Sequence, residues 1–208
     1  MNDYFSKLNK ASTSKVIDEM KQYAIEQKVP IMQDEGLLYL KQLVHLCQVT
    51  KILEIGTAIG YSAIQMARLN SQIHIDTIER DEALVTMANR FVKRSKRQSQ
   101  ICIHHADALS IDLTTLESQY DLIFIDAAKA QYIKFFERFE GLLRPHGLIV
   151  SDNLLFHGLV TTKEKIESRN LRALIRKIKE YNEWLAKNKK YKTTFLSIGD
   201  GIAVSEKC

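Results

Sequence analysis

Short apolar runs alternate along the chain with longer segments in which apolar residues recur every three or four positions. The short runs predict five buried strands, at residues 51–55, 73–78, 101–104, 121–126 and 147–153. The longer segments between them predict helices at residues 60–69, 81–95 and 129–142. Strands that alternate with helices in this way are typical of a parallel sheet that is covered by helices on both faces.

The two ends of the chain depart from this alternation. Two helices are expected before the first strand, at residues 10–28 and 33–47. A long amphipathic helix is expected at residues 163–188, with an apolar stripe and basic residues largely opposite. The apolar runs 192–197 and 202–205 flank a glycine turn and predict a hairpin. The expected fold is therefore α/β, with a mostly parallel sheet that ends in an antiparallel pair.

The length and composition favour one globular domain over residues 1–208, with N-terminal helices over 1–48 and an α/β core over 49–208. No apolar run approaches the roughly 20 residues of a membrane span, and the first 30 residues lack the apolar segment of a signal peptide. The cysteines show no paired spacing; they are Cys47, Cys102 and Cys208. Free thiols of this kind predict a reducing, cytoplasmic location. The lack of a membrane-spanning run predicts no membrane partner.

The net charge of +5 permits an anionic partner such as nucleic acid. Residues 163–192 hold eleven Lys and Arg against four Glu. A second basic cluster contains Arg90, Lys93, Arg94, Lys96 and Arg97. The alternative interpretation is that both clusters are ordinary solvated helix faces.

The first strand runs into a glycine turn with the pattern E-x-G-x-x-x-G, formed by Glu54, Gly56 and Gly60. Gly56 allows a sharp backbone turn, and Gly60 allows another group to approach closely. Ala58 stands where a dinucleotide-binding turn has its second glycine, so a pyrophosphate fits poorly. The turn favours a smaller adenosine-type cofactor with a charged amino-acid tail, although an ordinary strand–helix turn is the alternative.

Acidic residues stand at the carboxyl ends of the expected strands, which is the ligand-binding edge of such sheets; they are Glu54, Glu79, Asp107, Asp126 and Asp152. Glu79 lies 23 positions after Gly56, near the spacing at which an acidic residue binds ribose hydroxyls. Its alternative role is helix capping together with Asp81. If Glu79 binds ribose, Asp107 and Ala108 face the adenine.

Asp126, Asp152 and Asn153 are expected to meet because they end neighbouring parallel strands. Three oxygen ligands without Cys or His suit a hard cation such as Mg²⁺. Close carboxylates would repel one another without a cation, although turn and helix capping is the alternative. Lys129 stands at an expected helix start, against the positive end of the helix dipole. That position makes Lys129 a candidate general base beside the metal, unless it is a solvated surface lysine.

These motifs resemble the cation-dependent class I O-methyltransferases, S-adenosylmethionine enzymes related to catechol and caffeoyl-CoA O-methyltransferases. The resemblance rests on residues 53–62, Glu79-Arg80, residues 124–129 with Tyr132, and residues 150–153. Within that family the chain is most similar to bacterial tRNA 5-hydroxyuridine methyltransferases. The Ala-Ala pair before Lys129 fits this branch, because plant relatives usually have Ala-Asp there.

The resemblance implies a Rossmann-like methyltransferase fold with a seven-stranded sheet, and a homodimer. It implies that S-adenosylmethionine is bound by Met32, Glu54, Gly56, Ser62, Glu79, Asp107, Ala108 and Asp126. It also implies that Mg²⁺ is held by Asp126, Asp152 and Asn153, with Lys129 and Asp126 as the catalytic residues.

The implied reaction methylates 5-hydroxyuridine at the tRNA wobble position to 5-methoxyuridine, so the expected partner is the tRNA anticodon loop. The long basic helix would then hold phosphates through Arg169, Arg172 and Arg176. A small-molecule catechol-type O-methyltransferase with the same site is the alternative. A non-catalytic RNA-binding module that keeps only a cofactor pocket is a third interpretation.

Overall fold

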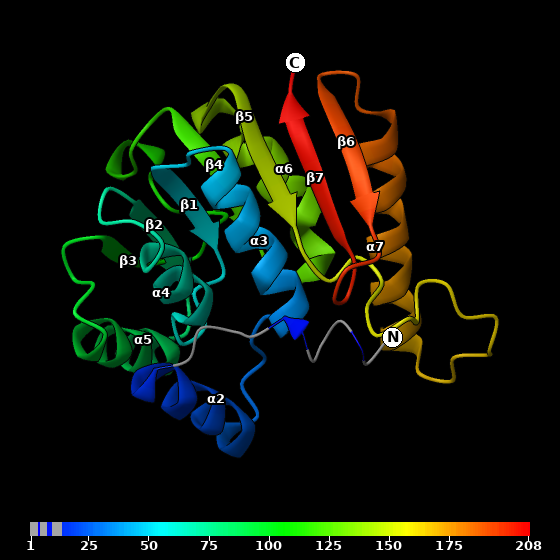
Figure 1. Cartoon of the computed structure of the whole chain (residues 1–208). Coiled ribbons are helices and arrows are strands. Elements are labelled where there is room, and N and C mark those ends of the chain that lie inside the picture. The colour runs from blue at the N-terminus through cyan, green and yellow to red at the C-terminus, as the bar shows by residue number, and fades with distance from the viewer. Residues whose placement is uncertain (1–3, 5–7, 10–13) are drawn as a thin grey trace.

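The computed structural model describes Tyr4, Leu8, Asn9 and residues 14–208. Within these residues one seven-stranded sheet has the order β3-β2-β1-β4-β5-β7-β6 (Figure 1). Its strands are β1 (Lys51–Ile55), β2 (His74–Glu79), β3 (Ile101–His105), β4 (Tyr120–Ile125), β5 (Leu143–Ser151), β6 (Tyr191–Leu196) and β7 (Ile202–Lys207). The first five strands pair in parallel, and β7 pairs antiparallel with both β5 and β6. The expected fold class is therefore confirmed.

Helices cover both faces of the sheet, with α3 and α4 in front of it and α6 and α7 behind it in Figure 1. The helices are α2 (Lys15–Gln27), α3 (Asp34–Leu46), α4 (Tyr61–Ala67), α5 (Glu82–Arg94), α6 (Tyr132–Phe139) and α7 (Arg169–Lys187). Short 3-10 turns are η1 (Leu113–Thr115), η2 (Lys129–Gln131) and η3 (Glu140–Leu142).

Alternate residues of each central strand contribute to two separate hydrophobic cores, one on each face of the sheet. Ile52, Phe124 and Val150 pack in the core beneath α2, α3, α4 and α5. Leu53 and Ile123 point to the opposite face and pack with residues of α6 and α7. Because both faces are buried, the central strands are continuously apolar, which is the pattern expected of a parallel sheet.

Several helices and strands begin or end at residues other than those predicted. The predicted helix 163–188 begins only at Arg169, where the Ser168 side chain accepts a hydrogen bond from the Leu171 amide. The predicted helix 129–142 is divided into η2, α6 and η3. Strand β5 begins at Leu143 and not at residue 147. Helix α2 begins at Lys15, and the predicted helical residues 10–13 lie outside the described part of the chain.

Among the helices of the described residues, none has the length and apolar character required to cross a membrane. The three cysteines are free and exposed.

Asp121 ties together the starts of three central strands. Its Oδ2 accepts hydrogen bonds from the Thr50 and Lys51 amides at 2.8 and 2.9 Å and from the Thr50 hydroxyl at 3.0 Å. Its Oδ1 accepts from Arg144 Nε at 2.5 Å. Although burial opposes ionisation, these hydrogen bonds leave the pKa of Asp121 below its usual value. The charged carboxylate is therefore the form that the folded state prefers.

The substitution Asp121→Asn is expected to reduce the free energy of unfolding by about 2 kcal/mol at neutral pH, because charge-assisted hydrogen bonds are lost. The depressed pKa makes this contribution complete above the unfolded pKa of roughly 3.9 and removes it as the pH falls through the folded-state pKa. Urea unfolding of both proteins at several pH values measures the difference.

Asp112→Asn is the matched control, since Asp112 is exposed and accepts its hydrogen bonds within the short turn η1. A difference between wild type and Asp121→Asn that stays constant to about pH 3 would contradict the role of the charge.

Candidate active site

A cavity of about 790 Å³ lies at the carboxyl ends of the strands. Its walls come from the segments that follow β1, β2, β3 and β4, and from residues 29–33 before α3. Seven of the predicted cofactor residues line it: Met32, Gly56, Ser62, Glu79, Asp107, Ala108 and Asp126. The cavity is thus where the topology of a parallel sheet places a ligand.

The turn after β1 lies directly against the end of β4. Gly56 has φ +105°, and a Cβ added there would stand 2.1 Å from the carbonyl oxygen of Asp126. The Asp126 amide in turn donates to the Ile55 carbonyl at 3.0 Å. Only glycine allows this approach, so the turn and Asp126 form one wall of the cavity.

Glu54 is buried behind this wall and does not itself line the cavity. Its carboxylate accepts hydrogen bonds from the Ser62 and Thr77 hydroxyls, each at 2.5 Å. Burial raises the pKa of Glu54 to about 7, against the lowering effect of these two hydroxyls. Glu54 is linked to the cavity through Ser62, which lines it, and its contact with the cofactor stays a prediction.

Glu79 lines the cavity and also supports the glycine turn. Its Oε2 accepts from the Ala58 amide at 2.9 Å, and its Oε1 accepts from the Arg80 amide at 2.9 Å. The capping role belongs to Asp81, whose side chain accepts from two amides at the start of α5. Glu79 Oε1 also accepts from the Asp81 amide at 3.1 Å, so Glu79 braces the approach to α5 while Asp81 caps the helix.

Asp107 and Met32 stand on other walls of the cavity. The Asp107 carboxylate accepts from the Leu109 amide at 2.8 Å, which shapes the turn that presents Ala108. Met32 is buried, and its methyl group faces Gly36 of α3. The segment before α3 thus adds a wall to the cavity that the strand ends do not supply.

Asp126 and Lys129 lie together on the cavity wall, with Lys129 Nζ 3.7 Å from Asp126 Oδ1. Burial raises the pKa of Asp126, and the nearby Lys129 charge works in the opposite direction. Burial also raises the pKa of Asp152 to about 7, and the neighbouring negative charge of Asp126 adds to the effect. The structure therefore brings the two carboxyl groups near each other, as expected from their positions at the ends of neighbouring parallel strands.

Asp152 is buried and accepts a hydrogen bond from the Asn153 amide at 2.7 Å. Its backbone carbonyl accepts from the Tyr132 hydroxyl at 3.1 Å. Asn153 faces the cavity in a left-handed conformation, with φ +61°. The Asp152-Asn153 pair is thereby held in a fixed orientation at the end of β5.

Asp200 is a third buried carboxylate that sequence reasoning missed, with only 5% of its surface exposed. It accepts hydrogen bonds from the His157 amide at 2.5 Å and from Asn153 Nδ2 at 3.4 Å. Its negative charge also raises the pKa values of Asp126 and Asp152. Its position between two glycines suggested only a hairpin turn, because the sequence pattern does not show that this turn reaches the end of β5.

The donor set at this end of the sheet fits a hard divalent cation. Asp126, Asp152 and Asn153 offer oxygen atoms only, and buried carboxylates in mutual repulsion gain from a cation between them. The glycine turn and the acidic side chain of Glu79 fit an adenosine cofactor beside it.

The three arginines predicted to bind nucleic acid lie at the start of α7, away from the cavity lining. Arg172 Nη1 donates to the carbonyls of Ile166 and Glu167 at 2.6 and 2.7 Å. Arg176 lies 3.5 Å from Glu180, and Arg169 is exposed. The structure thus uses Arg172 to hold the loop before α7.

Known proteins resemble this chain over most of its length. The O-methyltransferase family model matches residues 7–208. The catechol O-methyltransferase of Niastella koreensis is 33% identical over 176 residues, which cover 80% of this chain and 77% of that protein. Tapetum-specific methyltransferase 1 of Arabidopsis thaliana is 31% identical over 183 residues, with 86% and 77% covered.

Solved structures show the same likeness. A Staphylococcus aureus protein provisionally assigned as a caffeoyl-CoA O-methyltransferase is 40% identical, with a TM-score of 0.93 and coverage of 99% of this chain and 98% of that one. The O-methyltransferase TomG of Streptomyces achromogenes, solved in complex with S-adenosylmethionine, is 26% identical, with a TM-score of 0.82 and coverage of 99% and 95%. The chain therefore belongs to the O-methyltransferase family, as an S-adenosylmethionine-dependent enzyme of the caffeoyl-CoA and catechol type.

Proposed function

We propose that this methyltransferase is cation-dependent and acts on a hydroxyl that lies next to a second oxygen. The observation that carries the proposal is the gathering of Asp126, Asp152 and Asn153 beside Lys129 at the end of the cavity. When bound, S-adenosylmethionine supplies an electrophilic methyl group, and Mg²⁺ lowers the pKa of a hydroxyl that it binds. Two adjacent oxygens on the acceptor would both bind this cation and would thereby hold the acceptor beside Asp126, Asp152 and Asn153.

The residues that line the cavity would bind the parts of the cofactor in turn. Glu79 offers its carboxylate to ribose hydroxyls, and Asp107 with Ala108 borders the adenine. Gly56 and Ser62 lie where the methionine part of the cofactor would end, with Glu54 orienting Ser62 from behind. Met32 is buried at the cavity wall and would pack against the bound cofactor.

Lys129 would move the acceptor proton. Its Nζ lies at the cavity wall, 3.7 Å from Asp126 Oδ1, so the carboxylate orients it toward the acceptor. Asp126 would serve both the cation and this lysine, which is why we assign both residues to catalysis. Fixed positions for donor and acceptor would supply much of the rate enhancement.

The specific acceptor that we propose is 5-hydroxyuridine at the tRNA wobble position, which yields 5-methoxyuridine. Its 5-hydroxyl and 4-carbonyl are adjacent oxygens, like those of a catechol. A base in a single-stranded loop can be turned out into a cavity. The net charge of +5 supports an anionic partner. A homodimer also stays a prediction.

A small-molecule catechol is the second candidate acceptor, and the surface of α7 favours it. Arg172 is already bonded to loop carbonyls, and Glu180 faces both Arg176 and Lys177. In the other basic cluster, Arg94 pairs with Glu19 of α2. Cations that are partly neutralised by their own chain attract phosphates less strongly.

Incubation with S-adenosylmethionine, Mg²⁺ and tRNA that carries 5-hydroxyuridine is expected to give 5-methoxyuridine, measured by mass spectrometry of nucleosides. The product should disappear with EDTA. The same protein with a simple catechol tests the second acceptor. Product from catechol alone would contradict the tRNA proposal, and EDTA-resistant product would contradict the cation.

Reversing the charge of two arginines of α7 tests the RNA surface. The double substitution Arg169→Glu and Arg176→Glu is expected to weaken tRNA binding by about tenfold or more at low salt, because phosphate contacts are electrostatic. The control is the double variant Lys15→Glu and Lys192→Glu. It changes the net charge by the same amount, but at positions outside α7. Equal weakening in both double variants would contradict a specific RNA surface on α7.

Asp200 is expected to position the cation site through Asn153 and the His157 amide. Asp200→Ala should weaken Mn²⁺ binding about tenfold, as loss of a supporting hydrogen bond typically does. Asp200→Asn should retain part of the affinity, since its oxygen can still accept from the His157 amide. Paramagnetic resonance of free Mn²⁺ measures the affinity.

Binding of S-adenosylmethionine by the Asp200 variants is the control, because Asp200 does not line the cavity. Unchanged Mn²⁺ affinity in Asp200→Ala would remove the positioning role, and equal loss of both ligands would indicate a general structural defect.

A further inference from the structure

A group of side chains whose types can bind metals lies at the opposite edge of the sheet from the hairpin. Asp76 of β2 pairs in register with Cys102 of the edge strand β3, and His104 follows two residues later. Because strand side chains alternate between faces, Cys102 and His104 point to the same face. One potential ligand atom from each residue lies within 4.8 Å of the other two.

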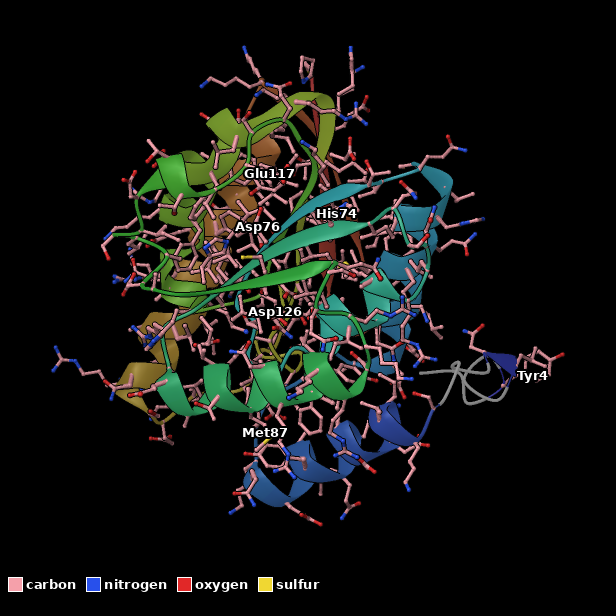
Figure 2. The ribbon with its side chains drawn as sticks, turned by 90° about the vertical axis from the view of Figure 1, so that its left-hand side faces the viewer. Tyr4, His74, Asp76, Met87, Glu117 and Asp126 are labelled. Atoms are coloured by element: carbon pink, nitrogen blue, oxygen red, sulfur yellow. The ribbon has the colours of Figure 1, made fainter. Side chains whose placement is uncertain are left out.

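This group is separate from the active site. Of its three residues none lines the large cavity, and Figure 2 shows Asp76 and Glu117 above Asp126, away from the carboxyl ends of the strands. No step of the proposed methyl transfer uses Asp76, Cys102 or His104. A ligand bound by these three residues would therefore occupy a site of its own, whichever acceptor the enzyme methylates.

Two of the three side chains are already oriented. Asp76 and His104 are only 14% and 16% exposed, and Asp76 Oδ1 lies 2.7 Å from His104 Nε2. The Tyr120 hydroxyl donates to the other oxygen of Asp76 at 2.6 Å and accepts from the Glu117 amide at 2.9 Å. Hydrogen bonds of this kind to the outer oxygen of a ligand carboxylate are typical of metal sites.

The third side chain gives access from solvent. Cys102 is exposed and stands at the wall of a shallow hollow of about 120 Å³. The hollow is also bordered by Asp76, His74 and Glu117. A cation can enter from this side, and water can complete its coordination.

We propose that Asp76, Cys102 and His104 form a second metal site, for a borderline transition-metal ion such as Zn²⁺. A thiolate, an imidazole and a carboxylate together suit Zn²⁺ or Co²⁺ and do not suit Mg²⁺. Binding releases the thiol proton to solvent, and water takes the fourth position. If the bonds from the metal to Asp76 and to His104 are each about 2.0–2.1 Å long and meet at a tetrahedral angle, the two ligand atoms stand about 3.3 Å apart. The present 2.7 Å contact therefore opens by about 0.6 Å as the metal replaces the hydrogen bond.

The site would join the edge strand to its neighbour. The metal bonds would cross from β2 to β3, and Tyr120 would extend the link to the start of β4. The chain leaves β3 toward Asp107 and Ala108 at the cofactor cavity. The main consequence is a more stable β2–β3 edge, so bound metal should raise the unfolding temperature.

Titration of the full chain with Co²⁺, after removal of metals with a chelator, tests the proposal. Thiolate coordination gives an intense near-ultraviolet charge-transfer absorption, which the oxygen-only site at Asp126 cannot produce. The band is expected in wild type, and addition of Zn²⁺ should abolish it. Cys102→Ser should remove the band and reduce Co²⁺ affinity at this site by at least about tenfold.

The double variant Cys47→Ser and Cys208→Ser is the matched control and should keep the band, because it leaves Cys102 in place. His104→Gln should weaken Co²⁺ binding while Cys102 remains. Absence of the band in wild type, or its loss in the Cys47→Ser and Cys208→Ser variant, would overturn the proposal. So would a band that His104→Gln leaves unchanged, since the thiol would then bind without the cluster.

Discussion

The close approach of Gly56 to the backbone of Asp126 is the constraint on which the active site depends. A side chain at Gly56 would overlap the Asp126 carbonyl, so this glycine lets the end of β1 and the end of β4 share one wall. The Glu79 carboxylate holds the same turn from the side of β2 through the Ala58 amide. The wall therefore places the cofactor turn directly beside the carboxylate that we assign to the cation and to Lys129.

The buried carboxylates give this wall its chemical character. The negative charge of Asp200 acts on both Asp126 and Asp152. Burial raises the pKa values of Asp126 and Asp152 as well. Such an arrangement is costly unless a cation or protons compensate it. Packing alone gives no reason to bring acidic side chains near one another, so we attribute their association to a ligand. Glu54 differs, because two hydroxyls satisfy its carboxylate within the core.

Much of the fold and of the candidate site could be predicted from the sequence, because these features depend on local patterns of apolar, glycine and acidic residues. Continuous apolar runs placed the strands, and the parallel topology then brought Asp126 and Asp152 together. Helix starts were less predictable: residues 163–168 continue the charged pattern of α7, yet the Ser168 cap begins the helix only at Arg169. The position of Asp200 depends on a contact between distant segments, which periodicity does not encode. Arg172 bonds to carbonyls of the loop just before α7, a tertiary contact that the helical pattern of its own segment does not show. The same holds for Glu54, whose position behind the wall follows from Ser62 and Thr77.

The central claim is that the ends of β4 and β5 form a divalent cation site beside the cofactor. The most direct measurement is a crystal structure with S-adenosylhomocysteine and Mn²⁺, with anomalous diffraction used to locate the metal. We expect an anomalous peak bounded by Asp126, Asp152 and Asn153, next to the cofactor sulfur. Saturating Mn²⁺ with no peak at those residues, while the cofactor occupies the cavity, would contradict it.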